Sequence, residues 1–376
     1  MTTQHTSSPR ALADKLAHDG KLRDPAWIKA FASIPRHLFL PHIYQPHPDG
    51  GFTLASTPEE LAYQDEGWTT QINGTFPTPK DGEPIQGQPT SSSSAPGLMA
   101  VMLEALDVTD GVRVLEVGTG TGYNAALLCH RLGDQHVVTV EVDPVLAEQA
   151  QQRLAEVGYR PIVHVGDGAD GYPPGAPYDR VIVTCALTSL PWKLIEQTRQ
   201  GGVLVVPVWR GHLPAGLMLR LTATGGSLAR GQVLDAYGGF MPARNTPPAD
   251  AVQLLHRHQA AADEGGTAQT TSLTTGTSGE PWAWFAALVV PDAVSLGTIH
   301  DDGPPRHWLL TEDSWCYLTP DGRVVQGGRR HLWDEIEAAH STWEQLGQPA
   351  RHQCQVIIDP DGARLTYQGR EWPILL

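Results

Sequence analysis

The residues best suited to chemistry follow a short β-branched run in the middle of the chain. Glu116 lies near the end of VRVLEV (residues 112–117), and GTGTG (residues 118–122) comes directly after it. Glycines let a turn be tight and let a ligand lie against the main chain. The third glycine follows after one intervening residue, whereas the dinucleotide-binding fingerprint has two. This spacing argues against an NAD-like cofactor.

Two further acids end the next two apolar runs. Glu141 closes HVVTVEV (residues 136–142), at a distance along the chain where an acid can accept both hydroxyls of a ribose. Asp167 lies in GDG (residues 166–168) and can accept from an adenine amino group. Glu116 would repel a pyrophosphate but suits the methionine end of S-adenosylmethionine. Each acid alone is typical of a surface, but three at the ends of successive strands predict S-adenosylmethionine binding.

These acids meet only if strands and helices alternate between them. The apolar runs predict strands at 112–117, 136–142, 161–166, 180–186 and 202–208, and helices at 98–106, 123–132 and 144–157. This order predicts a parallel sheet with helices on both faces, which is a Rossmann-like α/β fold. We expect contacts to S-adenosyl-L-methionine, and to its product S-adenosyl-L-homocysteine, from one set of residues: Glu116, Gly118, Thr119, Gly120, Gly122, Tyr123, Glu141, Val142, Asp167 and Gly168.

Three regions are expected along the chain. Residues 1–96 form an N-terminal helical and loop region, in which Asp24-Pro25 reads as a helix start. Residues 97–245 form the cofactor-binding domain. Residues 246–376 contain seven of the eleven tryptophans, the turns TPDGR and DPDGA, and a helical face that repeats from Leu332 to Leu346, so they predict a small α+β accessory domain.

The stretch before the first expected helix of the sheet is rich in Gly, Pro, Ser and Thr. Residues 73–97 therefore read as a long loop, and loops of this length inside a domain are often functional. By composition alone, the TSSSS run within it (residues 90–94) reads as a flexible linker.

The sequence resembles the protein-L-isoaspartate O-methyltransferase family over about residues 30–242. The matching segments occur in the family's order: IPRHLFLP (34–41), AYQD (62–65), Ser94-Ala95-Pro96, EVGTGTGY (116–123), GDGADGYP (166–173), PYDRVIVT (177–184), GGVLVVPV (201–208) and FMP (240–242). Shared cofactor binding alone would not produce IPRHLFLP or the Ser-x-Pro sequence.

The resemblance implies a role for the serine run and a carboxylate as methyl acceptor. In the family a Thr/Ser-x-Ser-x-Pro loop closes over the site, so Ser94 would orient the acceptor carboxylate and act as the catalytic residue, and Ser92 would lie on the cofactor side. The resemblance therefore replaces the interpretation of residues 90–94 as a flexible linker. A carboxylate is ionised at neutral pH and needs no general base. An amine acceptor would usually be held by an Asp/Asn-Pro-Pro-Tyr/Phe sequence where this chain has TCALTSLP (184–191).

Two departures point to a branch of the family that tailors ribosomally made peptides. The tail from residue 246 has no counterpart in compact repair enzymes, and Ser93 replaces the apolar residue usual between the two hydroxyls. That branch methylates an ordinary Asp of a peptide macrocyclised by an ATP-grasp ligase (a graspetide) or a lanthipeptide synthetase, and the ester then closes to an aspartimide. Repair of isoaspartyl proteins is the alternative. A binding module without turnover and a small-molecule carboxylate methyltransferase also stay open.

Charge and composition exclude several other classes. The formal net charge of −15 disfavours nucleic-acid binding, and no apolar run is long enough to span a bilayer. The N-terminus lacks an apolar export segment, so a cytoplasmic protein with a peptide partner is expected.

The spacing of the cysteines and histidines does not predict a metal site. The four cysteines form no CxxC pair and read as buried reduced thiols, although Cys185 could instead line the pocket. His256 and His258 read as residues of a surface helix rather than as metal ligands. The tail either recognises the peptide or stabilises the fold or a dimer.

Overall fold

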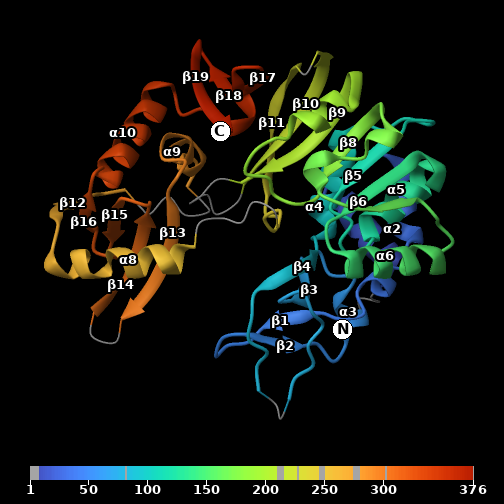
Figure 1. Ribbon diagram of the computed structural model, residues 1–376, viewed down its shortest axis with the longest axis horizontal. Coiled ribbons are helices and arrows are strands. Elements are labelled where there is room, and N and C mark those ends of the chain that lie inside the picture. The colour runs from blue at the N-terminus through green and yellow to red at the C-terminus, as the bar shows by residue number, and fades with distance from the viewer. Residues whose placement is uncertain are drawn as a thin grey trace. The chain divides into compact units, whose positions relative to one another are not determined.

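The computed structural model describes residues 8–80, 83–209, 216–226, 228–244, 250–273, 280–300 and 303–375 (Figure 1). The chain divides into two compact units: the first contains Met1–Cys185, Pro191–Val206 and Arg220–Ala229, and the second contains Ala186–Leu190, Pro207–Leu219 and Arg230–Leu376. The domain boundary expected after residue 245 lies outside the described residues.

The first unit begins with two capped helices. In α1 (Pro9–His18) the Ser8 side chain accepts from the backbone of Ala11, and in α2 (Pro25–Ser33) Asp24 accepts from Ala26. The expected helix start at Asp24-Pro25 is therefore confirmed. A short 3-10 turn, η1 (Arg36–Phe39), follows α2 within the IPRHLFLP segment.

The central part of the first unit is a parallel sheet. Its strands are β5 (Val114–Val117), β6 (Val137–Glu141), β7 (Ile162–Val165), β8 (Tyr178–Val183) and β9 (Thr198–Val208), in the order β9-β8-β5-β6-β7. Every residue of β5 and β6 is buried, which requires cover on both faces. The chain proceeds from β5 toward β7 and then returns to place β8 on the other side of β5. This topological switch point lies between β5 and β8.

The three longer helices before and between these strands agree with the sequence patterns. They are α4 (Pro96–Leu106), α5 (Tyr123–Leu132) and α6 (Pro144–Glu156), with the shorter elements η2 (Asp134–His136), η3 (Gly168–Asp170), η4 (Pro173–Gly175) and α7 (Trp192–Glu196). Asp143 caps α6 by accepting from Val145 and Leu146, as its place before Pro144 predicts.

The five strands expected to be parallel are parallel, but the large sheet as a whole is mixed. Strands β10 (Gly216–Gly225) and β11 (Leu228–Gly238) follow β9, and in the second unit β11 continues the order β19-β18-β17-β11. Strands β17 (Gln355–Asp359), β18 (Gly362–Tyr367) and β19 (Arg370–Leu375) pair antiparallel. The turns between them are too short for the crossover that a parallel pair needs.

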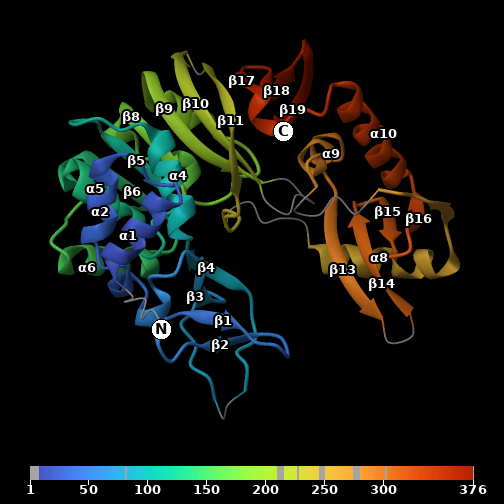
Figure 2. The ribbon, with the colours of Figure 1, turned by 180° about the vertical axis from the view of Figure 1, so that it is seen from behind.

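The expectation of one long loop over residues 73–97 is also wrong in part. A four-stranded antiparallel sheet has the order β2-β1-β3-β4 and consists of β1 (Tyr44–Pro46), β2 (Phe52–Leu54), β3 (Trp68–Ile72) and β4 (Pro89–Ser93) (Figure 2). The four-residue helix α3 (Pro58–Leu61) lies between β2 and β3. Ser91, Ser92 and Ser93 pair with β3, so most of the serine run is strand. Composition hides this, because small hydroxyl residues alternate between two faces without any apolar signal.

The second unit contains a five-stranded antiparallel sheet with helices. Its strands, in the order β12-β16-β15-β14-β13, are β12 (Thr267–Thr270), β16 (Arg323–Gly328), β15 (Ser314–Leu318), β14 (Gly303–Leu310) and β13 (Val294–His300). The helices are α8 (Ala251–Glu264), α9 (Ala283–Val289) and α10 (Leu332–Gln345), and η5 (Arg351–Gln353) precedes β17. The predicted helix from residue 332 and both predicted turns are confirmed.

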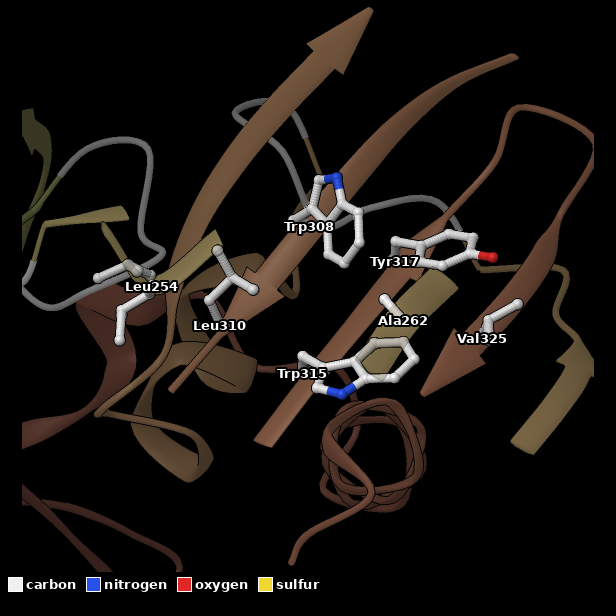
Figure 3. Packing of buried hydrophobic residues seen from close by; sticks show 8 residues of the cluster. Leu254, Ala262, Trp308, Leu310, Trp315, Tyr317 and Val325 are labelled. Carbon is white, nitrogen blue, oxygen red and sulfur yellow. The ribbon is translucent and has the colours of Figure 1, made fainter. Parts of the chain in front are cut away.

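Aromatic side chains of this sheet pack beneath α8. Trp308, Trp315 and Tyr317 form a buried cluster with Leu254, Ala262, Leu310 and Val325 (Figure 3). His258 is buried on α8 and its Nε2 atom lies 2.9 Å from the carbonyl of Thr311, so it is a core histidine rather than a surface one.

No helix of the described residues is both long and apolar enough to cross a membrane. Cys129, Cys316 and Cys354 are buried free thiols, and Cys185 is partly buried.

Trp308 is fully buried, so its replacement tests the aromatic cluster. Trp308→Ala should lower the free energy of unfolding of the second unit by about 3–5 kcal/mol, because it leaves a large cavity. Val252→Ala on the exposed side of α8 is the matched control and should change stability by less than about 0.5 kcal/mol. Denaturant unfolding followed by tryptophan fluorescence measures both, and equal effects would contradict the packing described.

Candidate active site

The glycine turn lies at the switch point of the parallel sheet. Gly118 has φ of 96° and its amide donates to the carbonyl of Val140 at 2.9 Å. Thr184, just after β8, donates from Oγ1 to the Gly118 carbonyl at 2.6 Å. A Cβ at Gly118 would lie 2.8 Å from Thr184 Oγ1. Glycine is therefore required here by the backbone angle and by the approach of β8.

Glu141 shapes the same turn from the end of β6. Its Oε2 atom accepts from the Gly120 amide at 2.8 Å, and its Oε1 atom accepts from the Asp143 amide at 3.1 Å. Each carboxylate oxygen keeps a further lone pair for a ligand. Glu141 thus organises the turn on which a ligand would lie, in addition to the ribose contact expected of it.

Glu116 is a fully buried carboxylate. It accepts from Asn124 Nδ2 and from Thr139 Oγ1, both at 2.7 Å. Thr139 in turn accepts from Thr119 Oγ1 at 2.6 Å, which places the Thr119 side chain in this network. Burial raises the pKa of Glu116 to about 7, and the charge of Glu141 adds to the rise.

These groups fit the ammonium end of S-adenosylmethionine. No described cation pairs with Glu116, and the Oδ1 atom of Asn124 is a buried acceptor with no described donor. A bound ammonium group would supply both the charge and the donors that these two side chains lack.

Asp167, Cys185 and Val142 lie at the carboxyl edge of the same sheet. Asp167 accepts from the Ala169 amide where η3 begins, and Gly168 is the first residue of that turn. Burial and the charges of Glu141 and Asp167 raise the pKa of Cys185 to about 12, so the thiol lies near both acids and is protonated at neutral pH. Val142 is 44% exposed there and offers apolar surface beside the acids.

The serine run lies against the glycine turn. A Cβ built at Gly120 would find the Ser92 carbonyl oxygen as its nearest atom, at 3.6 Å. Ser91 and Ser93 are buried, whereas Ser92 and Ser94 are partly exposed. Alternation along an extended chain places the last two on one face. Neither of their hydroxyls bonds to a described residue, so both are available to a ligand.

A hydrogen-bonded link that the sequence does not reveal joins the small sheet to the segment after Glu141. Gln71 on β3 donates from Nε2 to Asp143 Oδ2 at 3.1 Å and accepts from Thr90 Oγ1 at 2.8 Å. This chain ties β4 to the segment after Glu141. Nothing in the residue pattern around Gln71 indicates such a contact, because the two partners are 72 positions apart.

The Tyr123 side chain contacts residues of the N-terminal segment. Its ring packs against Phe31 and Phe39, with centroids 6.3 and 5.8 Å away, and the Arg36 guanidinium lies 5.7 Å from its centroid. Gly122 is the residue before α5 and its amide donates to the Thr119 carbonyl. Tyr123 therefore joins α5 to the N-terminal segment.

The raised pKa of Glu116 predicts a pH-dependent stability. The folded chain keeps a proton up to about pH 7, whereas the unfolded chain loses it near 4.5, so this group's contribution to stability falls as the pH rises between those values. Relative to wild type, Glu116→Gln should gain roughly 2 kcal/mol of stability between about pH 5 and about pH 8. Denaturant unfolding without cofactor at both pH values measures it, and a pH-independent difference would disprove the assignment.

The family model described as "Protein-L-isoaspartate(D-aspartate) O-methyltransferase (PCMT)" matches residues 7–220. Over 201 residues the chain is 38% identical to a protein-L-isoaspartate O-methyltransferase of Ignicoccus hospitalis, covering 53% of this chain and 81% of that one. The enzyme of that name from Thermococcus sibiricus is 37% identical over 204 residues, covering 54% and 78%.

A solved structure titled protein-L-isoaspartate O-methyltransferase is similar over 96% of this chain and 99% of its own, with a TM-score of 0.53 and 22% identity. At that identity the likeness shows the fold alone, but it extends into the tail, so the tail by itself does not separate a peptide-tailoring branch from other members. The chain belongs to the protein-L-isoaspartate(D-aspartate) O-methyltransferase family and is an S-adenosylmethionine-dependent enzyme of it.

Proposed function

We propose that the chain esterifies an isoaspartyl-type carboxylate of a protein or peptide, with the Ser94 hydroxyl guiding the acceptor oxygen. The observation that carries this proposal is the contact of the Ser92 main chain with the glycine turn at Gly120, on a strand whose partly exposed Ser92 and, just after it, Ser94 keep available hydroxyls. The names of the curated relatives support the isoaspartyl acceptor.

Methyl transfer to a carboxylate requires the protein mainly to position the acceptor and the methyl donor. The cofactor supplies a methyl group on a sulfonium, so a carboxylate oxygen forms the new C–O bond as the C–S bond breaks. An acceptor with a pKa near 4 is already ionised at neutral pH. Hydroxyl and amide donors can hold it in line without a general base, and exclusion of water strengthens their effect. Glu116 and Glu141 would hold the cofactor's ammonium and ribose, and Asp167 and Val142 its adenine.

A second candidate acceptor is an ordinary Asp of a macrocyclised ribosomal peptide. The observation that favours it is Ser93, whose buried hydroxyl accepts from Arg36 at 3.4 Å where an apolar residue is usual in the family. Methylation of such an Asp makes a good leaving group. The next backbone nitrogen then attacks the ester carbonyl, expels methanol and leaves an aspartimide.

Two peptides separate these candidates. The enzyme and cofactor are incubated with an isoaspartyl peptide and, separately, with a cyclised precursor peptide containing Asp. Mass gain of one methyl on the isoaspartyl peptide alone supports the first candidate. Methyl gain followed by loss of methanol on the Asp peptide alone supports the second. No methylation of either would overturn the proposal of an aspartyl-type acceptor.

Ser94→Ala tests the acceptor role. The variant should lose about 100-fold in kcat on the peptide that wild type accepts, because the acceptor is no longer oriented. Its affinity for S-adenosyl-L-homocysteine, measured by calorimetry, should stay within about 3-fold. Glu141→Ala should instead lose cofactor affinity. Ser33→Ala, at the exposed end of α2, is the control and should match wild type.

We further propose that the tail binds the acceptor chain. A cleft of about 710 Å3 opens at the end of the five-stranded sheet, with Arg306, His307, Thr319 and Asp321 in its lining. The Arg306 guanidinium lies 4.5 Å from the centroid of Tyr317, and no described carboxylate pairs with it. Burial lowers the pKa of His307, which leaves it neutral at pH 7. A stacked guanidinium suits the carboxylates or main-chain carbonyls of a bound peptide.

Arg306→Ala should raise KM for the acceptor about 10-fold, because one or two charge-assisted hydrogen bonds are lost, and should leave kcat unchanged. Arg329→Ala, whose side chain is 86% exposed, is the matched control and should keep the wild-type KM. Steady-state kinetics on the accepted peptide measures both. An unchanged KM in Arg306→Ala would remove the tail from acceptor recognition.

A further inference from the structure

We infer that Arg36, together with Asp65, is a positioning residue that fixes the backbone on which Ser94 stands. The inference rests on the proposed role of Ser94 as the acceptor-orienting hydroxyl. Both residues belong to segments that had no assigned role in the sequence, IPRHLFLP and AYQD. Neither touches the Ser94 hydroxyl in the structure.

Arg36 is fully buried and its guanidinium donates hydrogen bonds to two distant segments, residues 62–66 and Ser94. Its Nη1 atom donates to the carbonyls of Ala62 and Gln64 at 2.8 and 3.1 Å. Its Nη2 atom donates to the carbonyl of Glu66 at 3.1 Å and to that of Ser94 at 3.0 Å. Arg36 therefore fixes three carbonyls of the 62–66 segment and the main chain of the acceptor serine with one guanidinium.

Asp65 anchors the same segment to the other side of Ser94. Its Oδ1 atom accepts from the Gly97 amide at 2.6 Å, in the first turn of α4, and its Oδ2 atom pairs with Lys21 Nζ at 2.6 Å. A Cβ at Gly97 would lie 2.5 Å from Asp65 Oδ2, so a larger residue there would force the carboxylate to shift. Ser94 thus lies between two anchors, its own carbonyl and the amide of Gly97.

The arrangement requires an arginine. A planar guanidinium can reach acceptors that lie in several directions, whereas a lysine ammonium is a single point charge. The cation also lies over the ring of Tyr123, which opens the helix after the glycine turn. Burial lowers the pKa of Arg36 to about 10, so the side chain stays charged at neutral pH. An apolar residue could fill this space without the cost of desolvating a charge. We therefore attribute the buried guanidinium to its hydrogen bonds, which position the carbonyls of the two segments.

Arg36→Lys is the decisive variant. It should lower kcat on the accepted peptide by about 10- to 100-fold, because a displacement of about 1 Å at the acceptor is that costly. Affinity for S-adenosyl-L-homocysteine should stay within about 3-fold. Amide hydrogen exchange should rise in residues 93–97. Leu16→Ala, buried in α1, serves as a control that lowers stability without releasing these residues.

Asp65→Ala keeps the inference testable if Arg36→Lys fails to fold. Loss of one helix cap costs only about 1 kcal/mol, yet it should also lower kcat and raise exchange in residues 93–97. Wild-type kcat in either folded variant, or a kcat loss no greater than that of Leu16→Ala, would overturn the inference. If wild type methylates no peptide, the proposed function fails instead, and the exchange measurement still decides whether Arg36 and Asp65 hold the segment.

Discussion

The candidate site depends on the shape of the glycine turn, in which the Gly120 amide donates to the Glu141 carboxylate. The Gly118 amide bonds to Val140 and its carbonyl accepts from Thr184, so the turn is fixed at the switch point of the sheet. The turn then supports the main chain of Ser92 on its outer side. Glycine allows the positive φ angles of this turn and the close approach of the Ser92 main chain to Gly120. The glycine turn therefore lies beside both the acids at the strand ends and the serine run.

The three acids Glu116, Glu141 and Asp167 differ in their burial and in their hydrogen-bond partners. Glu116 lies beneath the turn, where desolvation favours the protonated form and hydrogen bonds from Asn124 and Thr139 oppose it. Glu141 and Asp167 follow at the carboxyl edge of the sheet, where backbone amides donate to them. Glu116 and Glu141 are buried and Asp167 is partly exposed, so the same carboxylate chemistry lies in three different surroundings.

The serine run, residues 90–94, and the start of α4 are held by contacts from residues 36–71. Arg36 binds its carbonyl, Asp65 caps the helix that follows, and Gln71 joins its strand to Asp143. None of these contacts is local in sequence. They give a short serine strand a defined position although it has almost no apolar side chains of its own to bury. The second unit, by contrast, has a buried cluster that contains Trp308, Trp315 and Tyr317.

The sequence by itself determined the local parts: the parallel strands, the capped helices and the acids at strand ends follow from short-range patterns such as Asp143-Pro144 and the spacing of Glu116 and Gly118. Only the tertiary structure decided that most of the serine run is a strand, that the large sheet is mixed, and that Arg36 and Gln71 contact the serine run. The physical reason is that pairing partners and buried hydrogen bonds join residues tens of positions apart. Side-chain periodicity carries no information about contacts at that range.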